Sequence, residues 1–442
     1  MSGAPVGDAM LLVAYQCGPG LGSVSQLGWQ WFTGLAGRRP VCLVTHIRNR
    51  PAIEAAADRP TGARVIYIDT EWFAGPLYRL ARRLFPRSEH AVFMLAQLDW
   101  FVFDAVALRT LRRDRAAGAP WRLLHLATPV TVSAPTRLHR LGLPVVRGPL
   151  NCGLPVPPGF EALMRDDAMG LSKLRGLPAL VESLFGSLRH SAAVLVATAA
   201  TRAALPSAVR PRSVRMLENA VDPDRFVAAE PIAAPGKGVP LRVSFVGRLV
   251  AVKALPLLLQ AMARLRAQGI PVVLDVVGDG PMAGPWREQS AELGLASCVQ
   301  WHGLLPAAGV AQVVSRSHVF CLPSVRESGG AVLLEAMACA RPVIGMDFGG
   351  PAELVDDAVG WKVAMPDEAT AIAGLAHALQ QAYQQPEEAV QRGLQARQRV
   401  LDDHTWSAKL AAADALYARV LGGALAAPRA PLGRAKSAVQ RT

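Results

Sequence analysis

The sequence predicts two α/β lobes, each built on a doubly wound parallel sheet, that face each other across a cleft. The chain has 442 residues, which at roughly 150 residues per domain is enough for two large cores. Short apolar runs alternate with helical patterns in two successive series. A segment rich in Pro, Gly and Ala without periodicity separates the series, and we expect it to be a linker at 227–240.

The first series predicts the first lobe, residues 1–226. It opens with an apolar run at 10–15, a glycine-rich stretch, a helical pattern at 26–35 and a second apolar run at 40–45. This order of strand, loop, helix and strand is the building unit of a parallel sheet with helices on both faces. Further strands are expected at 63–68, 123–126, 145–147, 193–197 and 213–217.

One apolar segment of this half, 91–108, approaches the length of a membrane span. Gln97, Asp99 and Asp104 interrupt it, so we expect a buried helix. The N-terminus has no basic region before its apolar stretch, so no secretory signal is expected and the predicted location is cytoplasmic.

The second series predicts a second lobe at 241–403. Its expected strands lie at 241–246, 272–277, 299–302, 319–322 and 342–345. Residues 406–421 have apolar side chains at helical spacing, which predicts a helix, within 404–423, that crosses back to the first lobe. The last residues, 424–442, are expected to form a disordered basic tail.

Composition excludes several classes of protein. Hydrophobic residues are 51% and charged residues 18%, which excludes a disordered chain. The net charge of +13 fits a polyanion, an anionic membrane or phosphorylated substrates. Aromatic residues are only 6% and do not interleave with the basic ones, so nucleic acid is not an expected partner. The scattered cysteines exclude a disulfide scaffold or zinc module and fit a reducing compartment: Cys17, Cys42, Cys152, Cys298, Cys321 and Cys339.

The stretch 319–338 is the most informative part of the chain. After an apolar strand, a loop carries Glu327, Ser328, Gly329 and Gly330, and a helix with Glu335 follows. Glycines at a helix N-terminus let a phosphate approach free backbone N–H groups. The two carboxylates are eight positions apart, about 12 Å along a helix, which is wider than the roughly 5–9.5 Å of a hydrolase pair. They suit separate parts of one extended, hydroxyl-rich ligand; the alternative is one solvated and one capping glutamate.

A second stretch places two cations after the predicted strand 241–246. Arg248 and Lys253 lie at its carboxyl end, where ligands of open α/β sheets bind. A planar guanidinium and a compact ammonium together suit a diphosphate. The alternative is that both are solvated surface charges.

The spacing of the glycines in the loop after the first strand argues against a dinucleotide ligand. Gly18, Gly20 and Gly22 do not have the G-x-G-x-x-G spacing, and no acidic residue ends the second strand. An NAD role is therefore not expected. A loop that lets a substrate lie against its backbone fits better.

His125 lies at the end of the predicted strand 123–126. A histidine in an apolar strand can be a hydrogen-bonded core residue. If the strand end faces the cleft between the lobes, the same histidine can be catalytic. The sequence leaves both interpretations open.

Residues 76–87 predict a basic amphipathic helix. Leu77, Leu80, Ala81 and Leu84 share one side, Arg79, Arg82 and Arg83 take the other, and Pro76 suits its first turn. A second basic cluster follows the apolar helix: Arg109, Arg112, Arg113 and Arg115. The stripe either faces the core below a solvated basic face or docks on an anionic bilayer.

Taken together, these stretches resemble the GT-B glycosyltransferases of family 4, the retaining group 1 glycosyltransferases. The resemblance is strongest over 244–363, where it is carried by the residues at 247–253, 278–281, 302–303, 327–335 and 349–353. The amino half resembles bacterial polysaccharide-type members at 14–23, 147–153 and 218–222. The implied fold is two Rossmann-like lobes.

By this resemblance, the second lobe would bind a nucleotide-sugar donor. Arg248 and Lys253 would bind its diphosphate, Glu335 its ribose and Glu327 the hydroxyls of the transferred sugar. The amides around Ser328, Gly329 and Gly330 would approach the sugar or distal phosphate, and Leu304 would flank the base. Members often have a bulky residue before the second glycine, which Ser328 to Gly330 lack, so donor preference does not transfer.

The first lobe would supply the acceptor side. His125 matches the position at which members carry a histidine close to the donor sugar, so Glu327 and His125 are the expected catalytic residues. Gly22 and Ser23 would face the reaction centre from the acceptor-side loop. No metal is expected, because two cations and a helix N-terminus can neutralise the leaving diphosphate.

The expected function is retaining transfer of a sugar from a nucleotide-diphosphate sugar to a saccharide or lipid-linked saccharide. The expected pathway is surface polysaccharide assembly, of exopolysaccharide or lipopolysaccharide, with an anionic membrane surface as a further candidate partner. Two alternatives remain: a soluble small-molecule acceptor, or a catalytically silent nucleotide-sugar-binding subunit.

Overall fold

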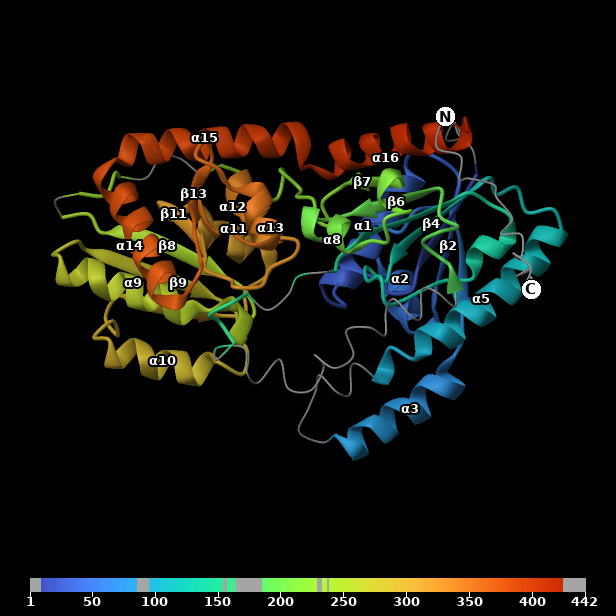
Figure 1. The fold of residues 1–442 in the computed structure, drawn as a ribbon, viewed down its shortest axis with the longest axis horizontal. Helices are drawn as coiled ribbons and strands as arrows, with labels where there is room; N and C mark the ends of the chain where they lie inside the picture. The colour runs from blue at the N-terminus through green and yellow to red at the C-terminus, as the bar shows by residue number, and fades with distance from the viewer. Residues whose placement is uncertain are drawn as a thin grey trace, which may run out of the picture.

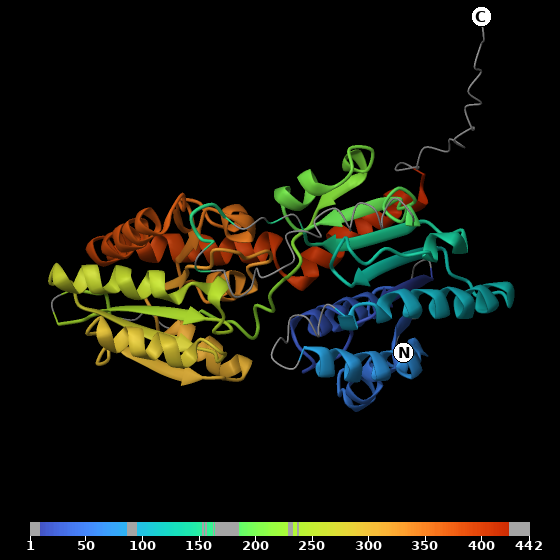
Figure 2. The same ribbon diagram turned by 60° about the horizontal axis from the view of Figure 1, so that its bottom comes forward.

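The computed structural model describes residues 9–85, 95–152, 154, 157–161, 163, 185–228, 233–236 and 238–423. The expected tail at 424–442 and parts of the expected linker lie outside the described residues. Two lobes lie side by side along the long axis of the molecule (Figures 1 and 2). Each lobe is centred on a parallel sheet, so the predicted fold class, two doubly wound α/β lobes, is confirmed.

The first lobe contains a seven-stranded sheet in the order β3-β2-β1-β4-β5-β6-β7. Its strands are β1 (Met10–Ala14), β2 (Val41–His46), β3 (Arg64–Ile68), β4 (Leu123–Thr128), β5 (Val145–Leu150), β6 (Ala193–Val196) and β7 (Ser213–Arg215). The helices are α1 (Ser23–Ala36), α2 (Arg50–Ala55), α3 (Glu71–Leu84), α5 (Asp99–Ala116) and α8 (Ala199–Ala204). The strand order reverses between β1 and β4, which makes their carboxyl ends a topological switch point.

The second lobe contains a six-stranded sheet in the order β10-β9-β8-β11-β12-β13. Its strands are β8 (Leu241–Val246), β9 (Val272–Val277), β10 (Val299–Gly303), β11 (Val319–Leu322), β12 (Val343–Met346) and β13 (Gly360–Val363). The helices are α9 (Leu255–Ala267), α10 (Ala283–Glu292), α11 (Ala307–Ser315), α12 (Ala331–Ala338), α13 (Gly349–Leu354), α14 (Glu368–Gln384) and α15 (Pro386–Asp403). Here the switch point lies between β8 and β11. The sequence did not predict β13, because it is four residues long and starts with glycine.

Two of the expected helices differ from their predictions. The helix expected at 91–108 begins at Asp99, where an acidic residue suits the first turn, and runs to Ala116. Residues 91–94 lie outside the described part of the chain. The second basic cluster therefore lies on α5 itself. The basic amphipathic helix is α3, and it begins at Glu71, so Pro76 is inside it and not in the first turn.

Only part of the apolar stripe of α3 faces the core. Its core-facing residues are the small Ala74 and Ala81, whereas Leu80 and Leu84 are 52% and 59% exposed. Trp72 at the start of the helix is 68% exposed. The first of the two interpretations given by the sequence, a core-facing stripe, is therefore wrong for Leu80 and Leu84, whereas Ala81 is buried and Leu77 is half-buried.

The chain passes between the lobes at several points: after β5, Phe160 is buried in the core of the second lobe, and two later crossings, near Val221 and Thr405, lie together. The N–H of Val221 donates to the carbonyl of His404 at 3.0 Å, and Val221 pairs with Thr405 in a parallel bridge. Val221 and Phe226 pack in the core of the second lobe, although the sequence assigned them to the first. A further contact between the lobes comes from Glu353 of α13, which pairs with Arg215 of β7.

The last described helix, α16 (Trp406–Leu421), packs on the first lobe. Figure 1 shows α15 over the second lobe and α16 continuing over the first. Leu410, Ala413 and Tyr417 belong to the core that α1 forms with one face of the first sheet. A Cβ on Gly34 of α1 would lie 2.4 Å from a methyl carbon of Leu410, so the two helices approach closely because position 34 is glycine.

Among the described residues, no helix is both long and apolar enough to cross a membrane. All six cysteines are free, and all but Cys152 are buried.

Leu410→Ala should lower the stability of the first lobe by about 2–5 kcal/mol, because it leaves a cavity between α1 and α16. The matched control is Leu394→Ala on the exposed face of α15, which should change stability by less than about 0.5 kcal/mol. Thermal and urea unfolding of the whole protein measure both. Equal effects of the two substitutions would contradict the packing described for α16.

Candidate functional site

Residues from both lobes line a hollow of about 360 Å³. Asn151, Cys152 and Leu154 follow β5 of the first lobe, and the second lobe contributes Val252, Arg326 and Ser328. The second-lobe residues belong to the loops after β8 and β11, the two strands at the switch point of that sheet. The hollow therefore lies where ligands of open α/β sheets bind.

Lys253 and Glu327 form an ion pair at this cleft. Lys253 ends the short 3-10 turn Ala251–Lys253, and Glu327 lies in the loop 323–330 that follows β11. The two loops are joined by a hydrogen bond from the N–H of Val325 to the carbonyl of Val252, 3.0 Å long. The sequence predicted both side chains as ligand-binding residues but not that they contact each other.

Glu327 is held as a carboxylate. Burial acts to raise its pKa, but the Lys253 ammonium and the backbone N–H groups of Gly330 and Gly329 outweigh burial and lower it. The N–H of Gly330 lies 3.3 Å from Oε1. Gly330 is also the residue that caps the N-terminus of α12, so the charge of Glu327 is stabilised by the helix end as well.

Gly349 and Gly350 lie directly against the backbone of the 323–330 loop. The N–H of Gly350 donates to the carbonyl of Glu327 at 2.9 Å. A Cβ on Gly349 would lie 2.2 Å from that carbonyl oxygen, and one on Gly350 would lie 2.5 Å from the carbonyl oxygen of Ser328. Side chains at these positions would push the loop toward the cleft, which gives a physical reason for the paired glycines.

The remaining predicted donor residues surround the same edge of the second sheet. Arg248 is exposed just after β8, and Leu304, 78% exposed, follows β10. Glu335 is partly buried on α12, where burial raises its pKa to about 7 and the charge of Arg225 opposes the shift. The two glutamates of the motif thus have different partners, and the roles of all these residues stay predictions.

His125 lies inside the first lobe. It is fully buried in β4, with Nε2 2.7 Å from the carbonyl oxygen of Gly148 and Nδ1 2.8 Å from the hydroxyl of Tyr417. Burial lowers its pKa to about 4, so the ring is neutral at physiological pH. Its ring packs edge-on against Trp31. Of the two interpretations left open by the sequence, this geometry favours the hydrogen-bonded core residue, because both ring nitrogens already have protein partners.

On the acceptor side, Gly22 and Ser23 are exposed at the start of α1. They follow β1 at the switch point of the first sheet, as the predicted acceptor-side loop requires. No described residue contact tests whether they face a reaction centre, so their role also stays a prediction.

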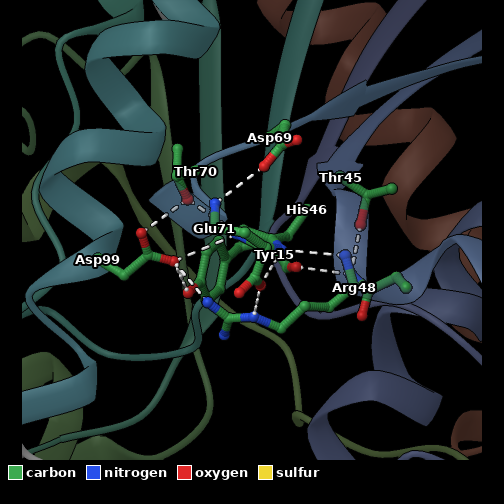
Figure 3. A network of polar contacts seen from close by, with 9 residues as sticks. Tyr15, Thr45, His46, Arg48, Asp69, Thr70, Glu71 and Asp99 are labelled. Carbon is green, nitrogen blue, oxygen red and sulfur yellow. Dashed lines mark hydrogen bonds and ion pairs between the residues drawn. The ribbon is translucent and has the colours of Figure 1, made fainter. Parts of the chain in front are cut away.

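A buried polar network lies at the same edge of the first sheet (Figure 3). At its centre, Asp99 is 1% exposed and accepts hydrogen bonds from the hydroxyls of Tyr15 and Thr70, each at 2.7 Å. Arg48 Nη2 and His46 Nε2 lie 3.2 and 3.3 Å from the same carboxylate. Burial acts to raise the pKa of Asp99, but the hydrogen bonds from His46, Thr70 and Tyr15 outweigh it, so the carboxylate is ionised.

The outer part of this network reaches solvent. Arg48 is held by Glu71, the first residue of α3, and both side chains are nearly half exposed. Asp69 accepts a hydrogen bond from the N–H of Glu71 at 2.9 Å. The network therefore presents one cation, Arg48, and one carboxylate, Glu71, to a ligand at this edge. The buried part of the network holds both in place.

Sequence reasoning missed this network, although part of the signal was present. Tyr15, His46 and Thr70 follow or end three neighbouring strands, β1, β2 and β3, and the carboxyl ends of parallel strands meet at one edge. Asp99 comes from the first turn of α5, which no local pattern links to those strands. Within the described part of the chain, no three His, Cys, Asp or Glu side chains gather as a metal site would require.

Residues 235–399 match the profile of the family described as "Glycosyl transferases group 1". Among curated proteins, the chain is 29% identical over 246 residues to the 2-deoxystreptamine glucosyltransferase of Streptomyces kanamyceticus, over 53% of this chain and 62% of that protein. It is 33% identical over 150 residues to the putative colanic acid biosynthesis glycosyltransferase WcaL of Escherichia coli, over 32% of this chain and 36% of that protein. The chain thus matches between about a third and two thirds of these relatives' lengths.

Solved structures share the fold over nearly the whole chain. Sucrose-phosphate synthase from Thermosynechococcus elongatus aligns with a TM-score of 0.62 and 19% identity, over 94% of this chain and 100% of that one. WaaG, a glycosyltransferase of lipopolysaccharide biosynthesis, aligns with a TM-score of 0.57 and 16% identity, over 92% and 99%. The architecture is therefore that of GT-B glycosyltransferases, and the match over 235–399 is to the group 1 glycosyltransferase family.

Gly349→Ala should displace the 323–330 loop, because the new Cβ would meet the Glu327 carbonyl at 2.2 Å. Gly62→Ala is the control, since its φ is also positive, +85° against +63° at Gly349, but there is open space around its Cβ. Both should lose about 1–2 kcal/mol to backbone strain, and only Gly349→Ala should also speed hydrogen exchange at the Gly350 amide. Unchanged exchange there would contradict the support assigned to the glycine pair.

Proposed function

We propose that this protein is a retaining glycosyltransferase of group 1 that uses a nucleotide-diphosphate sugar as donor. The observation that carries the proposal is the Lys253–Glu327 ion pair beside the N-terminus of α12, at the cleft between two Rossmann-like lobes. It lies within the segment that matches the family profile. HepE of Anabaena, which shares the fold with a TM-score of 0.61 and 14% identity, has been solved in complex with UDP, which supports a nucleotide as part of the ligand.

Each part of the donor has a matching group. The diphosphate takes the charges of Arg248 and Lys253, and Lys253 is then shared between phosphate and Glu327. The transferred sugar lies against Glu327 and the amides of Gly329 and Gly330, and the ribose hydroxyls bind Glu335. The base lies beside Leu304, whose exposed side chain offers it an apolar contact.

The chemical step needs charge stabilisation more than proton transfer by the protein. The acceptor hydroxyl attacks the anomeric carbon from the side of the leaving group, the bond from that carbon to the distal phosphate oxygen breaks, and the hydroxyl proton passes to the departing phosphate. Negative charge develops on the phosphate, where Arg248, Lys253 and the α12 N-terminus stabilise it without a metal ion. Positive charge develops at the sugar ring, where the carboxylate of Glu327 stabilises it.

The acceptor binds in the first lobe. The exposed Arg48 and Glu71 lie at the carboxyl ends of its strands, and such a charged pair suits the hydroxyl and acidic groups of a saccharide. We propose a saccharide or lipid-linked saccharide in surface polysaccharide assembly, on the cytoplasmic face of the membrane. The similarity to WcaL supports this acceptor class, whereas the similarity to 2-deoxystreptamine glucosyltransferase favours a soluble small acceptor as the second candidate.

The outer surface of the first lobe favours the lipid-linked acceptor. Trp72, Leu80 and Leu84 of α3 are exposed beside Arg79 and Arg83, and α3 packs near the basic helix α5 (Figure 1). An exposed helix with aromatic, aliphatic and basic side chains suits the interface of an anionic bilayer. Since α3 begins at Glu71, docking of this helix would bring a lipid-linked saccharide to the polar network of Figure 3.

Nucleotide-sugar binding tests the donor site. In a thermal-shift panel of UDP-, GDP-, ADP- and CMP-sugars, one nucleotide series should stabilise the protein, by about 2.7 kcal/mol at 100 times its dissociation constant. Lys253→Ala should lose this shift, and Lys253→Ala and Glu327→Ala should each abolish transfer. Lys362→Ala and Glu288→Gln, outside the cleft, are the matched controls.

Two outcomes would refute the assignment. Wild-type turnover in both cleft variants would show that the pair is not the donor site. Stabilisation by a nucleotide sugar without turnover on any saccharide or small acceptor would favour the silent binding subunit.

Vesicle binding tests the membrane surface. The protein should bind vesicles containing phosphatidylglycerol, less tightly as salt rises, and should not bind phosphatidylcholine vesicles. Changing Trp72, Leu80 and Leu84 together to alanine should weaken binding at least about tenfold, because apolar area leaves the interface. The same change at the exposed Leu394 and Leu401 of α15 is the control. No binding by the wild type would favour the soluble acceptor.

A further inference from the structure

Glu218 lies in the crossing segment that leaves β7 for the second lobe. The side-chain amide of Asn151, which lines the cleft, donates a hydrogen bond to Glu218 Oε2 at 2.8 Å. No other hydrogen bond to this carboxyl group comes from the described residues. Glu218 is therefore oriented by a cleft residue through one oxygen only.

The main chain of Glu218 is fixed from the opposite side. Its carbonyl oxygen accepts a hydrogen bond from the ammonium group of Lys409, a residue of α16 that is only 5% exposed. That ammonium also lies 5.2 Å from the ring centre of Trp31 and 4.8 Å from that of Trp406. Burial lowers the pKa of Lys409 to about 7, but the amino group donates to this carbonyl in either protonation state. Together with its packing against two aromatic rings, this contact ties the backbone at Glu218 to α16.

The carboxyl group reaches the 323–330 loop of the second lobe. A Cβ on Gly329 would lie 3.7 Å from Glu218 Oε2 and 2.5 Å from the side-chain amide nitrogen, Nδ2, of Asn219. Glycine at 329 thus allows the crossing segment to touch the loop that carries Glu327. A ligand seated on the amides of this loop would lie within reach of Glu218.

The surroundings shift the pKa values of Glu218 and Glu327 in opposite directions. Burial, and then the nearby charge of Glu327, raise the pKa of Glu218, while the Asn151 amide and Lys409 oppose the shift. A protonated carboxyl group can donate and accept hydrogen bonds, which suits a sugar hydroxyl.

We infer that Glu218 binds the transferred sugar, with Asn151 setting the orientation of its carboxyl group, so that the sugar is recognised from the first lobe as well as from the 323–330 loop. This inference rests on the proposed function. It adds a specificity-determining contact that does not belong to the predicted donor set.

The test compares binding of a nucleotide with binding of its sugar conjugate. Dissociation constants of UDP and UDP-glucose, GDP and GDP-mannose, and ADP and ADP-glucose are measured by calorimetry for the wild type, Glu218→Ala and Glu218→Gln. For the pair in which the wild type prefers the sugar conjugate, Glu218→Ala should lose about tenfold of that preference and bind the free nucleotide within twofold of wild type. Glu218→Gln should keep most of it, because an amide also donates and accepts. Glu288→Gln on α10 is the surface control.

Three results overturn the inference. If Glu218→Ala keeps the preference for the sugar conjugate, Glu218 does not contact the sugar. If Glu218→Ala weakens binding of the nucleotide and of its sugar conjugate equally, Glu218 serves only to hold the two lobes in position. If the wild type prefers none of the conjugates to its nucleotide, the proposed function fails together with the inference; a preference that the variants retain refutes the inference alone.

Discussion

The pair of chain crossings that meet at Val221 and Thr405 is the constraint on which the site depends. Val221 pairs with Thr405 where the chain enters the second lobe and where it returns, and α15 and α16 continue this junction over both cores. The second sheet places the loops at its switch point in the cleft, and the first lobe completes the lining with the residues after β5. The junction brings the loop after β5 and the loops after β8 and β11 around one hollow. The amino group of Lys409 donates to the carbonyl of Glu218, so the inter-lobe geometry rests on a buried polar contact as well as on apolar packing.

Much of this could be predicted from the sequence, for a physical reason. Parallel strands buried on both faces appear as short apolar runs, and the residues after them must lie at the ligand-binding edge. Arg248, Lys253 and Glu327 are identified in this way, and the structure places Lys253 and Glu327 in contact. The helix at 406–421 is also predicted, because one apolar face with regular spacing needs a partner core.

Other features could not be predicted, because they depend on contacts between distant segments. His125 has the same local pattern whether it faces a cleft or the core, and only its distant partners Gly148 and Tyr417 favour the core. The carboxylate of Asp99 joins residues from three strands through a helix N-terminus. The stripe of α3 has the period of a core-facing helix, yet Leu80 and Leu84 are exposed. Periodicity cannot distinguish a protein core from another apolar phase.

Three glutamates near the cleft illustrate how environment divides roles among identical side chains. Lys253 and the α12 N-terminus keep Glu327 ionised, whereas burial raises the pKa of Glu335 to about 7 and also raises that of Glu218. Groups whose pKa values are pushed apart can perform different chemical tasks at one pH. An anionic carboxylate suits a site where positive charge develops on a sugar ring, and neutral carboxyl groups suit hydroxyls that need both a donor and an acceptor. The cleft therefore keeps Glu327 ionised beside its cations, while the raised pKa values of Glu335 and Glu218 reduce the negative charge that a diphosphate at Arg248 and Lys253 would meet.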